Sequence, residues 1–329
     1  MDNRDVRAPR GKLVESAEVP EETSPANRLP TMIRTSATLT LKFTDRTPPA
    51  PANAEHKPIQ AVSGAESIAA TLGRLGVLSG DLLFVHAALS SFDYIPGGTR
   101  SLMEGLLQAV GPSGTLVFPT LTGENSDPVR WKAPPVASQD IRRQILEATP
   151  PFDPLLSIPW KRVGELPLMA TLWPGAIRSF HPQVSFTAIG KRAEEICDGL
   201  GDNLDHPLSQ HGVLGRLYRA EARVLFLGTA WKTCTALHLV EHILYDPVPD
   251  HMCFEETAVI TSNGVRCYAN YRMFTQTTTD FEAIGESLEK TYPEAFAILP
   301  GENNRRMLLF PMKEIIDHAT PLMRISRGL

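Results

Sequence analysis

The sequence predicts an α/β fold in which helices cover both faces of a mixed sheet, giving a layered α/β/α single domain. Short apolar runs of strand length alternate with segments whose apolar residues recur at helical spacing. Apolar residues make up 42% of the 329-residue chain, which is enough for a sizeable core. Paired strand patterns around a turn occupy the last third of the chain, so we expect an antiparallel portion towards the C-terminus.

Residues 1–62 differ in composition from the rest of the chain, because they are rich in Pro, Thr, Glu and Ala and poor in aromatic residues. Such a segment gains too little from burial to offset the entropy that it loses on ordering. One stretch, 35–43, alternates Leu or Phe with Thr and Lys and has the period of an edge strand. We predict a low-complexity extension over 1–62 and one domain over 63–329.

The expected elements follow from the period of the apolar residues and from the residues that close each segment. Apolar runs too short for helices predict buried strands over 82–85, 115–120, 222–229 and 305–312. Asn263-Gly264 predicts a hairpin between strands 255–261 and 265–274. Helical spacing and closing glycines predict helices over 66–76, 101–111, 142–148, 235–244 and 280–291, with a final helix from Met312.

Composition and charge argue against several classes of function. The net charge is −5 and no run of Lys and Arg is interleaved with aromatic residues, so we expect no nucleic-acid partner. No apolar run approaches the ~18 residues of a membrane span, and the first residues lack the apolar core of a signal peptide. The four cysteines are scattered without a Cys-x-x-Cys pair, which predicts reduced thiols in a cytoplasmic protein with no membrane partner.

Residues 85–98, VHAALSSFDYIPGG, form the first candidate site, because they follow an expected buried strand and precede an expected helix. Open α/β sheets bind ligands at such positions. The hydroxyls of Ser90 and Ser91, main-chain N–H groups and the flexible Gly97 and Gly98 suit phosphate oxygens. An ordinary polar turn with a glycine pair is the alternative.

Two histidine motifs are further candidates. Pro182 holds His181 outside the helical region, which suits a fixed imidazole in a cleft; a surface loop histidine is the alternative. In HLVEH, His238 and His242 lie one helical turn apart and Glu241 lies three residues after His238, a pattern that binds zinc in inverzincins. A zinc site also needs a third ligand and a water position, and a partly exposed helix face is the plain alternative.

Several longer stretches carry a family resemblance, in the family's order and spacing. They are LGVLSGDLLFVHAALSSFDYIPGG, LLQAVGPSGTLVFPTLT, FDP at 152–154, PGAIRSFHPQVSFTAIGKRAEEI, VLGRLYRAEARVLFLGTAW, and T-x-x-H-L-x-E from Thr235 to Glu241. Over roughly residues 64–325 the chain resembles the aminoglycoside N3-acetyltransferase family, also called the antibiotic N-acetyltransferase family. The resemblance implies an α/β/α fold, transfer of an acetyl group from acetyl-coenzyme A to an amine, and no metal.

The resemblance also implies roles for individual residues. The catalytic residues that it implies are His181, Glu241 and His238. The coenzyme A contacts lie in the 85–98 loop and at one later serine: His86, Ala87, Leu89, Ser90, Ser91, Gly97, Gly98 and Ser185. The amine acceptor contacts Asp153, Lys232 and Thr235. No residue is expected to bind metal, since His242 falls on a position that the family does not fix.

The chemistry of such a transfer is consistent with these residues. An amine is mostly protonated at neutral pH, so a base must remove a proton as the amine attacks the thioester carbonyl. His181 is the expected base, because an unperturbed histidine has a pKa of about 6.5, and His238 is the next candidate. Donors in the Ser90–Ser91 region would stabilise the thioester oxygen. We expect direct transfer, with Cys234 as the alternative acyl carrier.

Two departures from the family pattern affect the acceptor. Lys232 and its neighbours stand where family members usually carry an acidic residue followed by Ser-Asn, and a lysine there would repel a polycation. Residues 210–213 replace a Gly-rich stretch and Ser-Pro. We therefore expect a monomeric or homodimeric coenzyme A-dependent N-acetyltransferase, in biosynthesis or resistance, whose small-molecule amine is not a typical polycationic aminoglycoside. The alternatives are a zinc metallohydrolase built on HLVEH and a non-catalytic coenzyme A-binding protein.

Overall fold

The computed structural model describes residues 61–132, 134–199, 203–293, 297–300 and 306–329. The strands are β1 Leu82–Ala87, β2 Thr115–Pro119, β3 Ile177–Arg178, β4 Phe186–Gly190, β5 Arg223–Leu227, β6 Cys253–Ser262, β7 Val265–Phe274, β8 Ala297–Pro300 and β9 Arg306–Pro311. The helices are α1 Ala65–Arg74, α2 Thr99–Val110, α3 Gln139–Ala148, α4 Glu165–Leu172, α5 Ala193–Cys197, α6 Val213–Arg219, α7 Leu237–Leu244, α8 Phe281–Thr291 and α9 Met312–Ser326. The edge strand expected at 35–43 lies outside the described residues, and the boundary at residue 62 stays a prediction.

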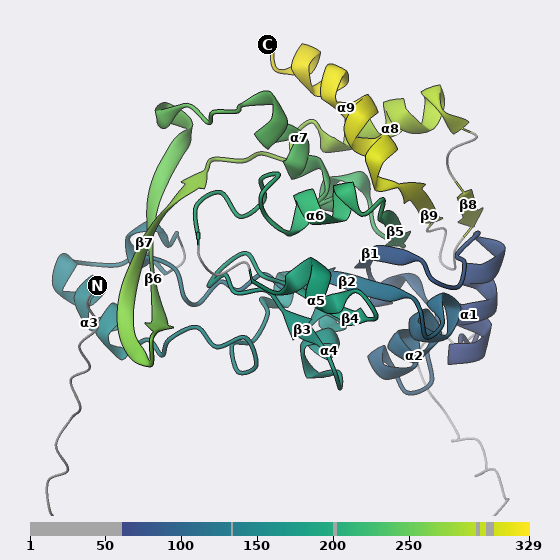
Figure 1. The fold of residues 1–329 in the computed structure, drawn as a ribbon, viewed down its shortest axis with the longest axis horizontal. Helices are drawn as coiled ribbons and strands as arrows, with labels where there is room; N and C mark the ends of the chain where they lie inside the picture. The colour runs from purple at the N-terminus through teal and green to yellow at the C-terminus, as the bar shows by residue number, and fades with distance from the viewer. Residues whose placement is uncertain (1–60, 133, 200–202, 294–296, 301–305) are drawn as a thin grey trace, which may run out of the picture. The chain divides into compact units, whose positions relative to one another are not determined.

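The main sheet has seven strands in the order β3-β4-β2-β1-β5-β9-β8, with β1 in its interior (Figure 1). β1 runs parallel to β2 and to β5. The other pairs, β2 with β4, β3 with β4, β5 with β9 and β8 with β9, are antiparallel. The long strands β6 and β7 pair with each other in a separate two-stranded sheet. The mixed sheet and the antiparallel C-terminal portion are confirmed.

The two faces of the main sheet carry two apolar clusters, because successive strand residues point to opposite sides. Leu83 and Val85 pack with α1, α2 and α4, whereas Leu82 and Phe84 pack with helices α5 to α9. In Figure 1, α1 and α2 lie on one side of the strands and α8 and α9 on the other. This is the layered α/β/α arrangement that the sequence predicts.

The hairpin is confirmed, since Asn263 and Gly264 have φ values of 50° and 76°, which the two-residue turn between twisted strands requires. The strands and helices expected from apolar runs are present, with shifted ends; Met312, for example, begins α9 rather than ending β9. Between Val163 and Ala222 the structure has five elements that the sequence did not predict: α4, β3, β4, α5 and α6.

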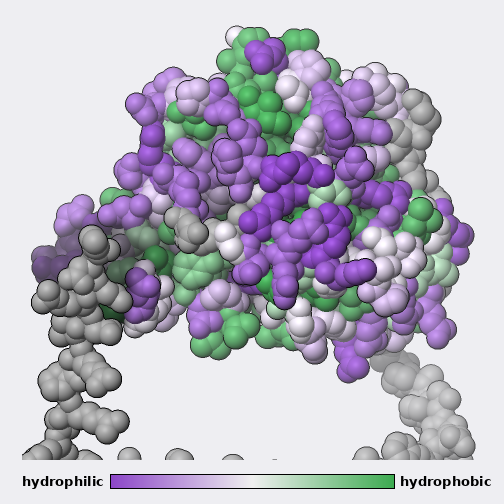
Figure 2. All heavy atoms as spheres, in the orientation of Figure 1, coloured by the Kyte–Doolittle hydropathy of each residue, from purple (hydrophilic) through white to green (hydrophobic). Residues whose placement is uncertain are grey.

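Three further observations concern the helices, the surface and the cysteines. Within the described residues, no helix is both long and apolar enough to cross a membrane. On the face drawn in Figure 2, hydrophilic residues predominate and hydrophobic ones form separate smaller areas. Cys197 and Cys234 are buried, Cys253 and Cys267 are partly exposed, and all four thiols are free.

Candidate active site

A cavity of about 510 Å³ opens where β1, β2 and β5 end. Because β1 is parallel to both neighbours, the three carboxyl ends meet at one edge of the sheet, where open α/β folds bind ligands. The lining comes from β1, from the segments that follow the three strands, and from α4; it includes His86, Ala87, Leu89, Thr229, Thr233 and Thr235. Four of the residues that the sequence predicts for ligand contact therefore line one cavity.

Two buried polar atoms belong to residues that line this cavity and lack a hydrogen-bond partner among the described residues. They are Nε2 of His86 and Oγ1 of Thr229. Buried polar groups are nearly always paired, so a ligand with its own hydrogen-bonding groups fits here. His86 is 6% exposed and lies against the rings of Phe84 and Phe226. Burial lowers its pKa to about 3, so the ring is neutral.

Four other predicted coenzyme A contacts, Ser90, Ser91, Gly97 and Gly98, do not line the 510 Å³ cavity. Ser91 is buried, and its hydroxyl donates to the Ala88 carbonyl at 2.6 Å, whereas Ser90 is exposed. Gly97 and Gly98 have φ values of 78° and 59° and lead the chain into α2. Their conformation explains why glycine occupies both positions, and their contact with coenzyme A stays a prediction.

Ser185 belongs to a buried polar cluster around Arg178, a residue that the sequence analysis did not single out. The guanidinium donates through Nε to Ser185 Oγ at 3.0 Å, and burial lowers the pKa of Arg178 to about 10. Its other acceptors are Thr120 O, Thr122 Oγ1, Pro154 O and Ser157 O. The cluster ties β3 to the segment after β2 and to the segment before α4, so Ser185 has a structural partner already.

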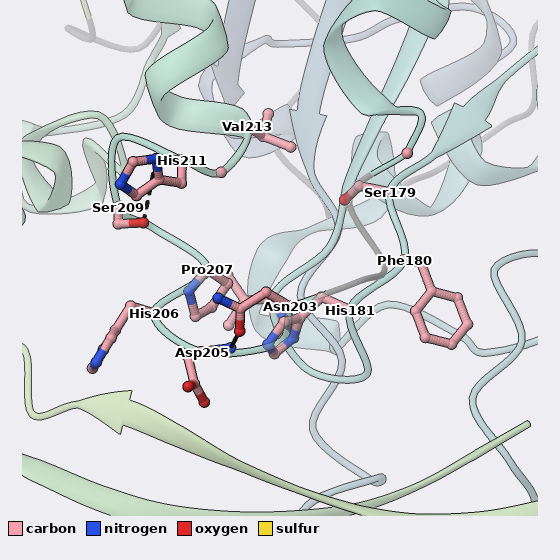
Figure 3. A pocket seen from close by; sticks show the side chains of 13 residues that line it. Ser179, Phe180, His181, Asn203, Asp205, His206, Pro207, Ser209, His211 and Val213 are labelled. Atoms are coloured by element: carbon pink, nitrogen blue, oxygen red, sulfur yellow. Dashed lines mark hydrogen bonds between the residues drawn. The ribbon is translucent and has the colours of Figure 1, made fainter. Parts of the chain in front are cut away.

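His181 lies in the loop after β3 and is 4% exposed (Figure 3). Its Nδ1 accepts from the backbone N–H groups of Gln183 at 3.1 Å and Val184 at 2.8 Å, which leaves the ring proton on Nε2 to donate to the Leu204 carbonyl at 3.1 Å. Burial lowers its pKa to about 4, although the bond to Leu204 opposes the shift. The ring lines a separate cavity of about 190 Å³, and both of its nitrogens are engaged by main chain.

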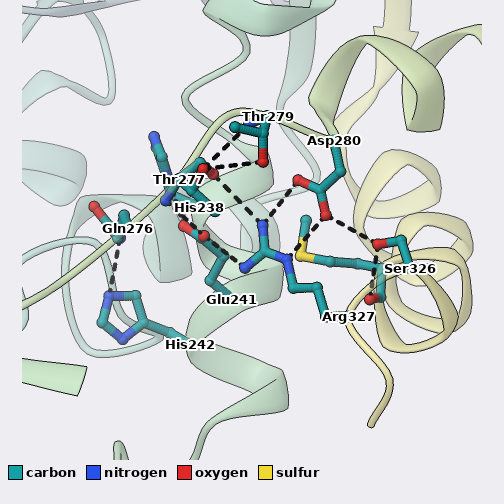
Figure 4. A network of polar contacts seen from close by, with 10 residues as sticks. His238, Glu241, His242, Gln276, Thr277, Thr279, Asp280, Ser326 and Arg327 are labelled. Carbon is teal, nitrogen blue, oxygen red and sulfur yellow. Dashed lines mark hydrogen bonds and ion pairs between the residues drawn. The ribbon is translucent and has the colours of Figure 1, made fainter. Parts of the chain in front are cut away.

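His238, on α7, forms a close pair with Glu241 (Figure 4). Nδ1 of His238 lies 2.6 Å from Oε2 of Glu241, because a spacing of three residues places both side chains on one helix face. The Glu241 side chain is fully buried, whereas 15% of the His238 side chain is exposed. The second Glu241 oxygen accepts from Nη1 of Arg327 at 2.7 Å and from the Thr277 N–H at 3.2 Å. No described residue hydrogen-bonds to Nε2 of His238.

His242, the last residue of HLVEH, is turned to Gln276, with 3.3 Å between its Nε2 and the amide nitrogen (Figure 4). Burial lowers the pKa of His242 to about 3. Among the residues that the structure describes, no three His, Cys, Asp or Glu side chains are grouped to hold a metal ion. Nδ1 of His238 thus faces Glu241, and Nε2 of His242 faces Gln276.

The three predicted acceptor contacts line three cavities. Thr235 lines the 510 Å³ cavity. Lys232 is exposed and lines an adjoining cavity of about 480 Å³, which shares part of its wall with the first. Asp153 lines a third cavity of about 840 Å³, and its Oδ1 accepts from two backbone N–H groups of the following turn. The structure brings Thr235 and Lys232 to neighbouring cavities, whereas the carboxylate of Asp153 caps a local turn.

Comparison with known proteins decides the family. Residues 84–324 match the family described as aminoglycoside 3-N-acetyltransferase. The chain belongs to this family. The YokD protein of Bacillus subtilis, named an SPbeta prophage-derived aminoglycoside N(3′)-acetyltransferase-like protein, is 29% identical over 256 residues, 77% of this chain and 90% of that protein. Its crystal structure has a TM-score of 0.74 at 26% identity and covers 82% of this chain and 96% of that chain. Aminoglycoside N(3)-acetyltransferase IX of Micromonospora chalcea is 35% identical over 205 residues, 61% of this chain and 69% of that protein.

Membership of the aminoglycoside 3-N-acetyltransferase family confirms the resemblance found in the sequence and the predicted enzyme class, an acyltransferase that acts on amines. The match ends at residue 324, three positions before Arg327. The side chain that contacts Glu241 from the end of α9 therefore lies outside the matched region. Sequence reasoning missed Arg327, and no local motif at that position marks it.

Proposed function

We propose that this acetyltransferase moves the acetyl group of acetyl-coenzyme A to an amine of a small molecule, with His238 as the general base and Glu241 as the group that orients it. The 2.6 Å contact between Nδ1 of His238 and Oε2 of Glu241 is the observation that carries the proposal. A carboxylate on one imidazole nitrogen fixes the tautomer and leaves the other nitrogen to exchange a proton. Family membership supports the class of reaction.

The proton follows one route through this pair. Glu241 accepts the Nδ1–H of His238, so the free lone pair lies on Nε2. As the amine nitrogen attacks the thioester carbon, Nε2 takes the proton that the amine loses, and the buried carboxylate stabilises the resulting imidazolium. The C–S bond then breaks, and Nε2 returns the proton to the departing sulfur. The base is regenerated, and the products are an amide and a thiol.

The buried, protonated thiol of Cys234 favours direct transfer over an acyl-enzyme intermediate. This thiol is fully buried, and burial raises its pKa to about 12. The thiolate is the nucleophilic form of cysteine, and a thiol with so high a pKa stays protonated at neutral pH. Cys234 is therefore a core residue in this proposal.

The proposed base is therefore His238 and not His181, which was the base expected from the sequence. To accept a proton at Nδ1, the His181 ring would lose the hydrogen bonds from Gln183 and Val184. Its pKa of about 4 also disfavours the charged form near neutral pH. We assign His181 to holding the loop after β3 against the segment around Leu204.

The 510 Å³ cavity is the proposed site of the pantetheine arm of coenzyme A. Unpartnered polar atoms of His86 and Thr229 can pair with its amide groups. Thr235 lines the cavity and lies just before α7, one helical turn ahead of His238 in the sequence. At the adjoining cavity, the exposed Lys232 would repel a polycation. The proposed acceptor therefore carries few positive charges, unlike a typical aminoglycoside.

Release of the coenzyme A thiol in the presence of a set of small primary amines tests the proposal, with sisomicin as the polycationic member of the set. His238→Gln should lower kcat by ~10²–10⁴, while calorimetry should show unchanged binding of acetyl-coenzyme A. His181→Gln is the matched comparison and should lose thermal stability but keep far more activity. The reverse ranking would return the base to His181, and a native chain that acetylates none of these amines would contradict the proposed function.

A further inference from the structure

Glu241 is held from two sides. Its Oε2 contacts His238, and its Oε1 accepts from Nη1 of Arg327 at 2.7 Å (Figure 4). Arg327 directly follows α9, and only 12% of its side chain is exposed. The end of α9 therefore brings a cation to a carboxylate that lies on α7, 86 positions earlier in the sequence.

Asp280, next to the start of α8, fixes the guanidinium of Arg327. Its Oδ2 accepts from Nε and its Oδ1 from Nη2, both at 2.9 Å. This two-pronged contact is the geometry in which arginine recognises a carboxylate best. The hydroxyl of Ser326 donates to the same carboxylate at 3.0 Å. Asp280, Arg327, Glu241 and His238 thus form one continuous polar chain.

We propose that Arg327 is a positioning residue for the base: it fixes the orientation of Glu241 and, through Glu241, that of the His238 ring. This inference rests on the proposed function of His238. A carboxylate that a guanidinium holds at one oxygen presents its other oxygen to the imidazole in one fixed direction. A base that is already oriented meets the attacking amine without first losing side-chain freedom.

Few other charged or titratable groups surround the pair within the described residues. Asp280 lies on the far side of Arg327. His242, next to Glu241 on α7, has a pKa that burial lowers to about 3 and is neutral. Loss of the Arg327 side chain therefore leaves Oε1 of Glu241 with the Thr277 N–H as its hydrogen-bond donor. The carboxylate can then turn away from His238.

The tautomer of His238 can be followed directly by NMR in protein labelled with nitrogen-15 at histidine, with His238→Gln used to assign the ring signals. In Arg327→Met, these signals should report a mixture of the two tautomers, because a freed carboxylate no longer holds the proton on Nδ1. Arg327→Lys keeps a charge without the fork and should change the signals less. Arg324→Met, which removes an exposed arginine from α9, is the matched control and should leave them unchanged.

Kinetics supply the second readout, with acetyl-coenzyme A and whichever amine of the set the native protein acetylates fastest. Arg327→Met should lower kcat by about 10- to 100-fold with little change in the KM for acetyl-coenzyme A. Added guanidinium ion should restore part of the rate. Arg324→Met should behave as the native protein does.

Native ring signals in a folded Arg327→Met protein would overturn the inference. So would native rates and native ring signals in Arg327→Gln, which also lacks the charge and the fork and remains decisive if the methionine variant does not fold. The NMR measurement needs no acceptor, so it tests Arg327 even if the native protein acetylates no amine. The failure of this inference is therefore distinguishable from failure of the proposed function.

Discussion

Lys232 occupies a short turn, η4 (Trp231–Thr233), between β5 and α7. Its backbone N–H donates to Glu282 at 3.1 Å, and its ammonium makes no ion pair with another described residue. The side chain is exposed at the 480 Å³ cavity next to the proposed pantetheine site. Its charge is thus available to a ligand that enters from this side.

Lys232→Asp should strengthen the binding of sisomicin, because it replaces a repulsive charge by an attractive one. An exposed charge pair contributes only about 0–1 kcal/mol, and salt screens it. Calorimetry at low and high salt should therefore show a modest gain that shrinks as salt rises. Lys191→Asp changes the net charge equally at an exposed position that lines none of the described cavities. An equal gain in both variants would show that Lys232 does not select the acceptor.

At the scale of single residues, the sequence predicts contacts along one helix better than contacts between distant segments. The spacing of three residues in HLVEH places His238 and Glu241 on one helix face, although the sequence suggested a possible zinc pattern there and not their hydrogen bond. Pro182 restricted the backbone of His181 but could not reveal that Leu204, 23 positions later, accepts a hydrogen bond from its ring. Arg327 reaches Glu241 over 86 positions and carries no pattern of its own.

At the scale of elements, α8 packs unusually close to η4. A Cβ placed on Gly285 of α8 would lie 1.9 Å from Cγ of Trp231. The indole of Trp231 is 1% exposed, and its Nε1 donates to Glu289 at 2.7 Å, so the ring has no room to move. The glycine therefore allows α8 to approach the turn that carries Lys232.

Gly285→Ala should lower the free energy of unfolding by about 1–3 kcal/mol, because overpacking outweighs the gain of up to about 1 kcal/mol in helix propensity. Urea denaturation measures this change. Gly73→Ala is the matched control in α1, since a Cβ there meets nothing within 4 Å. That variant should be slightly stabilised, and a stable Gly285→Ala protein would contradict the close packing.

Two of the elements that the sequence did not predict are too short to show a period. β3 has two residues and α5 has five. The strands at 82–85 and 222–229 were predictable because buried strands are apolar on both faces. The hairpin was predictable because Asn263-Gly264 specifies its turn locally. Strand order, in contrast, depends on contacts between segments that no local pattern encodes.

Across the part of the chain that the structure describes, three histidines are buried in neutral form. Burial lowers the pKa of His86 to about 3, of His181 to about 4 and of His242 to about 3. In the unfolded chain each would titrate near 6.5. Between these values the unfolded state binds more protons than the folded state, so the fold loses stability as the pH falls.

Stability should therefore be highest above about pH 6.5 and should decline towards pH 4, by up to about 1.4 kcal/mol per pH unit for each buried histidine. Urea denaturation between pH 7.5 and 5 measures the slope. His242→Phe should reduce it by the share of one histidine, whereas His251→Phe, at an exposed position, should not. A slope that is the same in the native protein and in both variants would assign the acid sensitivity to other groups.

The pairing of β1 with β5 has a consequence for how the chain reaches its native state. Leu83 lies opposite Arg223, 140 positions later in the sequence. A contact of such long range requires the closure of a large loop, and folding slows as the mean sequence separation of contacts grows. The 510 Å³ cavity opens where these two strands end, and α7 follows the second of them. We therefore expect the proposed pantetheine site to form only when this long-range pair of strands closes.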